Sequence, residues 1–405
     1  MKFIDGGVCA AQGFRASGIH VGVKTHNTGK KDLALIVSDC DCSAAAVYTK
    51  NVVKAAPLHV TKENLKNGKA RVVFANSGNA NACAPNGEEN ALRMCRAVAA
   101  ELGLGADEVI VASTGVIGQP LPVEVIESGV PNLASQLSYN GSQDAASAIM
   151  TTDLTMKELA VEVEIGGKSI KIGGIAKGSG MIHPNMGTML AFLTTDCAIN
   201  TDMIQKALLG ATNVSFNRVS VDGDSSTNDM LSLLANAAAG NAEITGEGED
   251  YNKFCEALNA LCVELAKMIA ADGEGATHLI TCTVSGAESE EDAESLSKSV
   301  ISSSLTKAAI FGADANWGRV LCAMGYSGVE FNPDGVNVAF KSEAGEILVC
   351  ENGRGLAFDE TFAKKILTEH DITIAISLSE GSAECTCWGC DLTYDYVRIN
   401  GDYRS

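Results

Sequence analysis

The stretch that most constrains the fold runs from Lys177 to Asp196, KGSGMIHPNMGTMLAFLTTD. Its first half is broken by glycine and proline, which interrupt helices and strands and therefore predict a loop. Its second half, Met189–Leu193, is continuously apolar and predicts a buried strand. Thr188 stands at the junction, directly after Gly187. A fold built around this stretch must bury the strand and still present the loop before it.

Thr188 suits one kind of nucleophilic chemistry. If the peptide bond between Gly187 and Thr188 broke, Thr188 would carry a free α-amino group beside its own hydroxyl. Such an amine can accept the hydroxyl proton and so activate the oxygen as a nucleophile. The residues indicate a candidate for self-cleavage, although a plain loop-to-strand junction explains the same letters.

Composition limits the class of protein. The chain has 405 residues, of which 46% are hydrophobic, so it can bury a full core as one large domain or two. Its formal net charge of -20 argues against nucleic acid or an anionic membrane as a partner. The start of the sequence lacks an apolar targeting region and no run is long enough to cross a membrane, so we expect a cytoplasmic protein. The 14 cysteines are therefore expected to be free thiols.

The pattern of strands and helices favours an α+β fold. A β-hairpin is predicted around Gly166-Gly167, and an apolar stripe at helical spacing predicts a helix over Asn252–Ala271. A strand is expected over Val214–Val221 and one long helix over Ala293–Ile310. Because strands and helices mix without a regular βαβ repeat, the sequence predicts a layered α+β fold rather than a doubly wound sheet.

Three further sites carry candidate chemistry. The buried strand Val109–Ala112 ends in STGVIG, where Thr114 and Gly115 offer a hydroxyl and a backbone N–H at a strand tip, as an oxyanion hole requires. Glu274 lies in the turn after the long helix and is either a solvated loop carboxylate or a ligand. His183, inside the central loop, is a possible helper.

The cysteine cluster at Cys385, Cys387 and Cys390 allows a different function. A CxxC pair could be redox-active or form half of a zinc site. It lies in an alternating strand pattern, however, and no second pair has matching spacing, so structural thiols are favoured. Signatures of nucleotide-binding loops, zinc proteases and α/β-hydrolases are absent from the sequence.

Segments spread along the chain resemble one family. In order they are GFRASGIHVGVK, NSGNANAC, STGVIG, the stretch that begins at Lys177, FNRVSVDGDSSTND, DGEGATH, GADANWGR and WGCDLTYDYVRINGDYRS. Together they resemble the ornithine acetyltransferase (glutamate N-acetyltransferase, ArgJ) family over nearly the whole chain. The combination is specific, whereas any one segment would not be.

The resemblance implies a layered mixed α/β sandwich of the DmpA/ArgJ-like type with a second, smaller α/β domain. With the polar stretch near residue 240 as a boundary, we expect a catalytic core domain of residues 1–240 plus 353–405. Residues 241–352 would then form the smaller domain.

The resemblance also implies a reaction. The precursor would cleave itself between Gly187 and Thr188, giving an α chain of residues 1–187 and a β chain of residues 188–405, in an α2β2 assembly. Thr188 would take the acetyl group from N2-acetylornithine and pass it to glutamate in two steps, without a metal or organic cofactor. Thr114 and Gly115 would form the oxyanion hole.

Substrate contacts follow from the same resemblance. The residues expected to bind substrate are Thr152, Lys177, Thr188, Glu274, Asn400 and Ser405. Lys177 would supply a cation for the α-carboxylate, and Glu274 is a candidate partner for a substrate ammonium group. The sequence departs from the family pattern twice, with Gly187 in place of the usual alanine and Ser405 in place of the usual terminal threonine.

Two questions stay open in the sequence. The same fold and cleavage could end in hydrolysis, as in N-terminal-nucleophile aminopeptidases and amidohydrolases. The family also contains members that use acetyl-CoA as a second donor and members that do not, and no residue decides between them.

Overall fold

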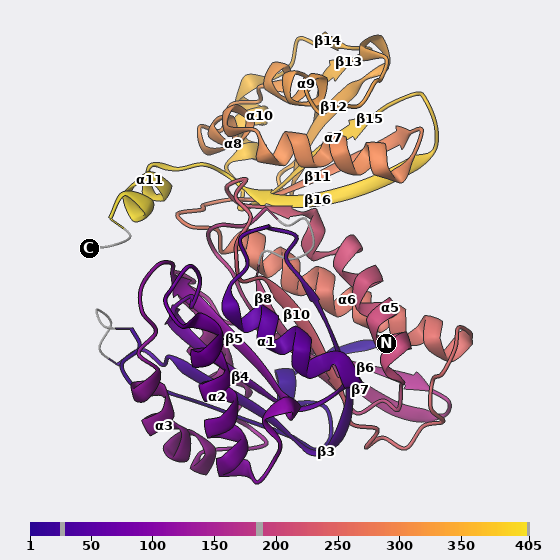
Figure 1. Cartoon of the computed structure of the whole chain (residues 1–405). Helices are drawn as coiled ribbons and strands as arrows, with labels where there is room; N and C mark the ends of the chain where they lie inside the picture. The colour runs from indigo at the N-terminus through magenta and orange to yellow at the C-terminus, as the bar shows by residue number, and fades with distance from the viewer. Residues whose placement is uncertain (25–28, 184–188, 403–405) are drawn as a thin grey trace. The chain divides into compact units, whose positions relative to one another are not determined.

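The computed structural model describes residues 1–24, 29–183 and 189–402. The chain forms two compact units, each built on one β-sheet (Figure 1). The first unit takes in Met1–Gly178, the described residues 189–217, and Ser225–Leu265. The second takes in Ser179–His183, Arg218–Asp224 and the chain from Ala266 onward.

This division differs from the predicted domain boundaries. Residues 353–405 were expected to join residues 1–240, with 241–352 as the smaller domain. In the structure β15 (Asp371–Ser377) and β16 (Ala383–Cys390) instead pair with the two edges of β11 (Leu279–Ala287) in the second sheet. The polar stretch near residue 240 is a loop within the first unit. The boundary between the units follows instead from the pairing of strands that are far apart in the sequence.

The first sheet is mixed and has nine strands in the described part of the chain. In spatial order they are β1 (Lys2–Ile4), β6 (Lys157–Ile165), β7 (Lys168–Lys177), β8 (Leu190–Thr195), β10 (Met230–Ala235), β3 (Leu33–Tyr48), β4 (Lys69–Asn79) and β5 (Val109–Val116), with β2 (Phe14–Ile19) also paired to β3. β6 and β7 form the predicted hairpin. β8 runs parallel to β10, and β4 runs parallel to β5.

Alternating side chains on the strands produce layers. On β3, Leu33 and Leu35 face a core shared with α2 (Gly87–Leu102) and α3 (Val123–Ser135). Ala34 and Ile36 point the other way, into an inner core that also contains residues of β8 and β10. α5 (Thr201–Val214) packs on β3 and β10. The first unit is therefore the layered α+β arrangement that the sequence predicts.

The remaining helices of the first unit frame this sandwich. They are α1 (Ala56–Asn64), α4 (Ser142–Ile149) and the first part of α6 (Glu249–Ala271), which continues into the second unit. The α6 side chain of Leu265 lies beside Gly174 of β7. The predicted helix over Asn252–Ala271 is thus confirmed.

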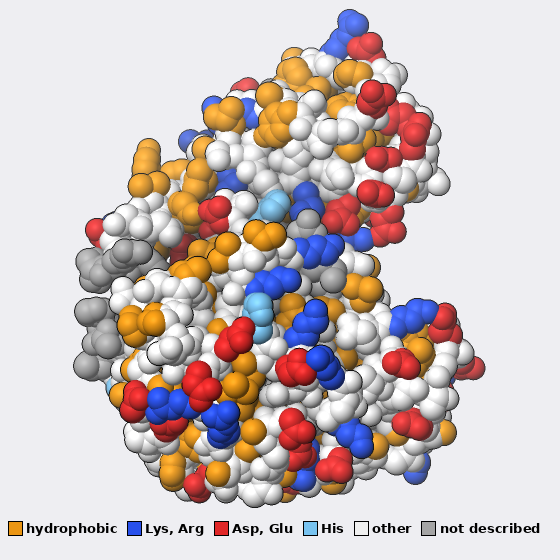
Figure 2. All heavy atoms as spheres, viewed as in Figure 1, with side chains coloured by type: hydrophobic (Ala, Val, Ile, Leu, Met, Phe, Trp, Pro, Cys, Tyr) orange, Lys and Arg blue, Asp and Glu red, His pale blue; other side chains and the backbone are white. Residues whose placement is uncertain are grey.

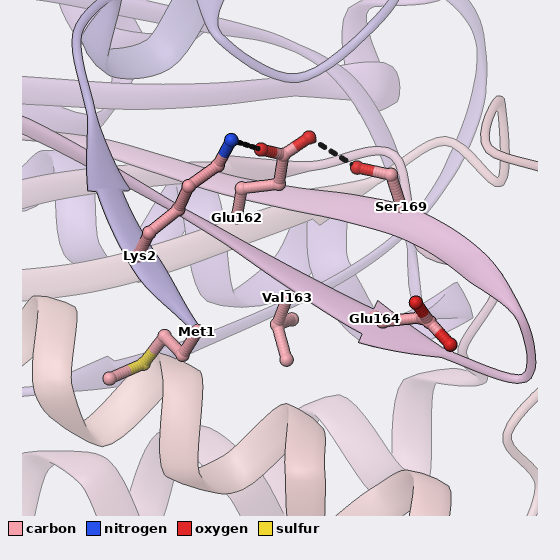
Figure 3. A pocket seen from close by; sticks show the side chains of 6 residues that line it. All are labelled: Met1, Lys2, Glu162, Val163, Glu164 and Ser169. Atoms are coloured by element: carbon pink, nitrogen blue, oxygen red, sulfur yellow. Dashed lines mark hydrogen bonds and ion pairs between the residues drawn. The ribbon is translucent and has the colours of Figure 1, made fainter.

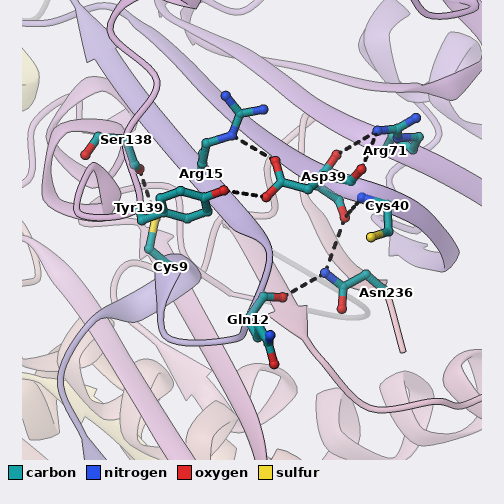
Figure 4. A network of polar contacts seen from close by, with 10 residues as sticks. Cys9, Gln12, Arg15, Asp39, Cys40, Arg71, Ser138, Tyr139 and Asn236 are labelled. Atoms are coloured by element: carbon teal, nitrogen blue, oxygen red, sulfur yellow. Dashed lines mark hydrogen bonds and ion pairs between the residues drawn. The ribbon is translucent and has the colours of Figure 1, made fainter. Parts of the chain in front are cut away.

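A polar network holds β3 where its pairing with β4 shifts register, between Val37 and Cys42. Figure 4 shows Asp39 accepting hydrogen bonds from Arg15 Nε at 2.9 Å and from the Tyr139 hydroxyl at 2.7 Å. Arg71 donates to the Asp39 backbone carbonyl at 2.9 Å. The Arg71 bond satisfies a backbone carbonyl that has no ladder partner on β4 at the irregularity.

The second unit has a seven-stranded sheet in its described residues. Its order is β14 (Arg354–Gly355), β13 (Gly345–Glu351), β12 (Asn337–Ser342), β15, β11, β16 and β9 (Val219–Ser220). Its core is shared with α7 (Glu290–Ser302), α9 (Trp317–Gly325) and α10 (Glu360–Leu367). Two further helices of this unit are α8 (Ser304–Phe311) and α11 (Tyr394–Gly401).

Two predicted elements were wrong. Only Val219–Ser220 of the strand expected over Val214–Val221 is strand, because α5 ends at Val214, Ser215 caps it, and Phe216–Arg218 form a 3-10 turn. The Ser215 hydroxyl bonds back to the helix carbonyl of Ala211, which favours the helical end. The single helix expected over Ala293–Ile310 is interrupted at Ser303, whose extended backbone and hydroxyl cap the start of α8.

Candidate active site

The tip of β5 carries the predicted oxyanion hole. Thr114 is 8% exposed, and Thr114 and Gly115 pair with Ser77 and Gly78 of the neighbouring strand β4. Gly115 has a φ of 130°, and a Cβ added there would lie 2.4 Å from the Gly78 carbonyl carbon. Both observations require glycine at this position, because the two backbones approach too closely for any side chain.

The side chain of Lys177 lies at the tip of β5. It ends β7, is 8% exposed, and its Nζ lies 3.5 Å from Thr114 Oγ1. It also pairs with Leu190, the first residue of β8. The structure therefore brings together two candidate residues, Thr114 and Lys177, that are far apart in the sequence.

Asp153 connects the loop that contains Thr152 to Gly178, the residue after Lys177. Its carboxylate accepts hydrogen bonds from the Gly178 N–H at 2.7 Å and from Lys157 Nζ at 2.8 Å. Burial would raise the pKa of Asp153, but Lys177 and Lys157 outweigh burial and hold the pKa well below its usual range. One anion thus faces two lysines. Thr152 itself is half-buried in the loop between α4 and β6.

Asp229 is a candidate that sequence reasoning missed. It directly precedes β10, is 2% exposed, and is followed by Met230, whose N–H donates to the Met189 carbonyl at 2.9 Å. Within the described residues its Oδ2 atom has no hydrogen-bond partner. Burial raises the pKa of Asp229 well above its usual range, against the opposing effects of Ser226 and Lys177. The only sequence signal was an acidic residue at the start of an apolar run.

Replacing Asp229 by asparagine tests this burial. Since the folded-state pKa is raised above the unfolded value of about 3.9, wild-type stability is highest below that pH and falls as pH rises through the folded pKa. Asp229→Asn removes this loss. We expect its thermal midpoint to exceed that of the wild type increasingly as pH rises. Asp5→Asn, at an exposed carboxyl, is the control; a constant difference across pH would contradict the assignment.

The second unit brings together two other candidates, Glu274 and Asn400. Glu274 lies in the turn after α6 and is 7% exposed, and its backbone N–H donates to the Ser179 carbonyl at 2.8 Å. Asn400, on α11, donates from Nδ2 to Glu274 Oε2 at 2.7 Å. A Cβ added to Gly180 would lie 2.4 Å from the Glu274 carboxyl carbon, so a side chain there would displace the carboxylate from its present position.

His183, the possible helper, lies in the second unit. Its Nδ1 is 3.0 Å from the Ser220 hydroxyl. Burial, followed by the charge of Lys298, lowers the pKa of His183. Gly187, Thr188 and Ser405 lie outside the described residues, so their predicted roles stay predictions.

Comparison with known proteins identifies the family. A model of the ArgJ family matches residues 15–405. The chain belongs to the ArgJ family. It is 49% identical over 406 residues to the arginine biosynthesis bifunctional protein ArgJ of Symbiobacterium thermophilum, with 100% of both chains covered. It is 47% identical over 406 residues, again with 100% of both chains covered, to the protein of that name from Caldanaerobacter subterraneus subsp. tengcongensis.

A solved structure agrees with this assignment. The crystal structure of the arginine biosynthesis bifunctional protein ArgJ from Bacillus halodurans is 45% identical to the matched part, with a TM-score of 0.50. The match covers 52% of this chain and 97% of that chain. The resemblance found in the sequence is therefore confirmed, and this ArgJ-family chain is an acyltransferase of arginine biosynthesis.

The cysteine cluster lies in the second unit. Cys385 and Cys387 are buried in the core of the second unit, and the Ser297 hydroxyl donates to Cys387 Sγ at 3.0 Å. All 14 cysteines are free thiols. Within residues 1–24, 29–183 and 189–402, no group of three or more His, Cys, Asp or Glu side chains could hold a metal ion. Cys385 and Cys387 thus pack within this core, where Cys387 also accepts one hydrogen bond.

Two hollows of the first unit lie away from the candidate residues. One, of about 300 Å³, lies along β1, β6 and β7 (Figure 3), where Lys2 and Glu162 form an ion pair at 2.7 Å. The other, of about 450 Å³, lies along α1 and the start of α2. Neither is lined by a residue predicted to act in this ArgJ-family enzyme. Among the helices described, none is both long enough and apolar enough to span a bilayer.

Proposed function

We propose that this chain is a glutamate N-acetyltransferase that moves an acetyl group from N2-acetylornithine to glutamate through Thr188. The observation that carries the proposal is the meeting of Lys177 with Thr114 at 3.5 Å. Lys177 is also paired with Leu190, two residues after the predicted nucleophile. A cation, a strand-tip hydroxyl and the strand that follows the nucleophile therefore belong to one small region of the first unit.

The charges in this region suit a substrate carboxylate. Asp153 is one anion shared by Lys157 and Lys177, and burial raises the pKa of Asp229, which disfavours a second negative charge there. Lys24 is a third cation, whose pKa burial lowers to about 8 against the opposing charge of Asp32. An excess of positive charge supports a role for Lys177 in binding the α-carboxylate that ornithine and glutamate share.

Maturation would create the nucleophile. Thr188 Oγ attacks the Gly187 carbonyl carbon, the peptide nitrogen leaves as the new α-amine, and water then hydrolyses the resulting ester. The match to the Bacillus halodurans structure supports this step, since nearly all of that solved chain covers only about half of ours. A chain cut near its middle would have that length.

Transfer would follow in two steps. The α-amine of Thr188, with a reference pKa of about 8, accepts the hydroxyl proton as Oγ attacks the acetyl carbon. Thr114 and Gly115 stabilise the oxyanion, and ornithine leaves with the returned proton. Glutamate then attacks the acetyl-Thr188 ester, which restores the hydroxyl and predicts ping-pong kinetics. Glu274, held by Asn400, would receive a substrate ammonium group.

Further parts of the proposal rest on the relatives. Because they are named bifunctional, we extend the proposal to acetyl-CoA as a second donor. The α2β2 assembly stays a prediction from family resemblance. A cytoplasmic location is supported by the free thiols. On the face drawn in Figure 2, acidic side chains lie among basic ones over the first unit.

The function is tested by supplying N2-acetylornithine with and without glutamate. We expect ornithine to accumulate catalytically only with glutamate, and N-acetylglutamate to form in equal amount, as followed by NMR or mass spectrometry. Release of acetate at the same rate in both mixtures would show an amidohydrolase instead. Replacing acetylornithine by acetyl-CoA in the same assay tests the second donor.

A further inference from the structure

We propose that Asn228 is a positioning residue that holds the predicted oxyanion hole in shape. The proposal rests on the proposed function, because it concerns how Thr114 and Gly115 would be aimed at a developing oxyanion. Asn228 is 6% exposed and lies in the segment Ser225–Asp229, which directly precedes β10. In the sequence this segment ends FNRVSVDGDSSTND.

Both donors of the Asn228 amide are used on backbone carbonyls. Nδ2 donates to the Ser113 carbonyl at 2.8 Å and to the Ala80 carbonyl at 2.6 Å. Ser113 is the residue before Thr114, and Ala80 follows the end of β4. One side chain thus joins the tip of β5 to the segment that leaves β4.

The orientation of Asn228 is itself fixed. Its Oδ1 accepts a hydrogen bond from the Thr227 hydroxyl at 2.6 Å, and its backbone N–H donates to the Ser226 hydroxyl at 3.1 Å. The Thr227 carbonyl in turn accepts the Ala55 N–H at 2.9 Å. An amide with every polar atom satisfied in a buried setting is held in one rotamer.

This arrangement acts directly before the predicted oxyanion hole. The Ser113 carbonyl lies one peptide unit before the Gly115 N–H, so a donor on that oxygen restrains the backbone that carries the Thr114 hydroxyl and leads to the Gly115 N–H. On the other side of Gly115, the Val116 carbonyl accepts the Ala80 N–H at 2.9 Å. The strand tip is therefore held before and after the predicted hole, which preorganises its donors.

The segment that contains Asn228 also links two strands. Two residues further on, the Met230 N–H donates to the Met189 carbonyl, at the start of the strand that follows the predicted nucleophile. The segment therefore connects the strand of the nucleophile with the strand of the hole. Catalytic groups must be held within about 0.5 Å of productive geometry, so loss of this connection should lower the rate more than substrate binding.

The experiment compares Asn228→Ala, Asn228→Asp and Thr227→Val with Asn241→Ala. Asn241 is the matched control, since it is a buried amide of the same unit that donates to two other carbonyls, those of Ala198 and Ala242. We expect Asn228→Ala to lower kcat by about tenfold or more, with each KM within about threefold of wild type. Asn228→Asp, which turns a carboxylate toward two carbonyls, should lose more, and Thr227→Val less.

Rates are divided by the cleaved fraction from intact mass, because the variants can also slow maturation. Asn241→Ala should lose thermal stability but keep kcat within about twofold. A kcat loss for Asn228→Ala no larger than that of Asn241→Ala, at equal thermal stability, would overturn the proposal. If Asn228→Ala does not fold, Thr227→Val, which keeps the amide, decides by the same comparison.

Hydrogen exchange separates this proposal from the proposed function. Without substrate, amides of Val109–Val116 should exchange faster in Asn228→Ala or Thr227→Val than in wild type and Asn241→Ala. Unchanged exchange there would refute the connection even if the wild type proves to be an acetyltransferase. A wild type without transferase activity would refute the proposed function, while faster exchange would still support the connection.

Discussion

Thr188→Ala is expected to leave the protein as a single 42.0 kDa chain without transferase activity. The variant lacks the hydroxyl that would attack the Gly187 carbonyl, and without cleavage no α-amine forms. Removing the nucleophile of a covalent mechanism typically lowers the rate by about 10⁴-fold or more. Intact-mass analysis measures cleavage, and formation of N-acetylglutamate measures transfer.

Thr188→Ser is the matched variant, because it keeps a hydroxyl and can still release an α-amine. We expect it to mature and to retain part of the activity. The nucleophile would be misassigned if Thr188→Ala were still processed between residues 187 and 188. An uncleaved wild-type chain with full activity would refute the cleavage step alone.

Gly115→Ala should lower kcat by about 100-fold or more, the usual cost of losing one oxyanion donor. The alanine Cβ would lie 2.4 Å from the Gly78 carbonyl carbon and 2.6 Å from the Asn79 nitrogen. Both are backbone atoms of β4, so the strand tip must move. A φ of 130° adds strain for any residue other than glycine.

Gly118→Ala separates the clash from the strain. Gly118 also has a positive φ, of 79°, but a Cβ there would meet nothing within 4 Å. We expect it to lose some stability and to keep its rate, as measured by thermal unfolding and steady-state kinetics. If Gly115→Ala retained its kcat while folded, the tip of β5 would not be the oxyanion hole.

Much of the fold could be predicted from local pattern. The hairpin of β6 and β7 follows from alternating side chains around Gly166-Gly167, and α6 follows from its apolar stripe. Errors arose where several structures fit the same letters, as at Val214–Val221, where the end of α5 and a 3-10 turn precede a strand of only two residues. Periodicity identifies a strand but not its partner, so the pairing of β15 and β16 with β11 could not be predicted.

Some residues of the candidate site could likewise be predicted from the sequence, and others could not. Thr114 and Lys177 were named from the sequence, but their meeting depends on how strands far apart in the chain pair. Asn228 and Asp229 were missed because asparagine and aspartate are common in loops, where they are usually solvated. Only burial, two bonded carbonyls at Asn228 and an unbonded oxygen at Asp229 in the described part of the chain set them apart.

The most direct test of the central claim is the mass of the β chain, residues 188–405, after incubation with N2-acetylornithine and no glutamate. The account predicts that one acetyl group is added at Thr188, and that added glutamate removes it as N-acetylglutamate. A β chain that stays unmodified while transfer proceeds would contradict an acetyl-Thr188 intermediate. Loss of the acetyl group to water at the same rate with and without glutamate would contradict a transferase.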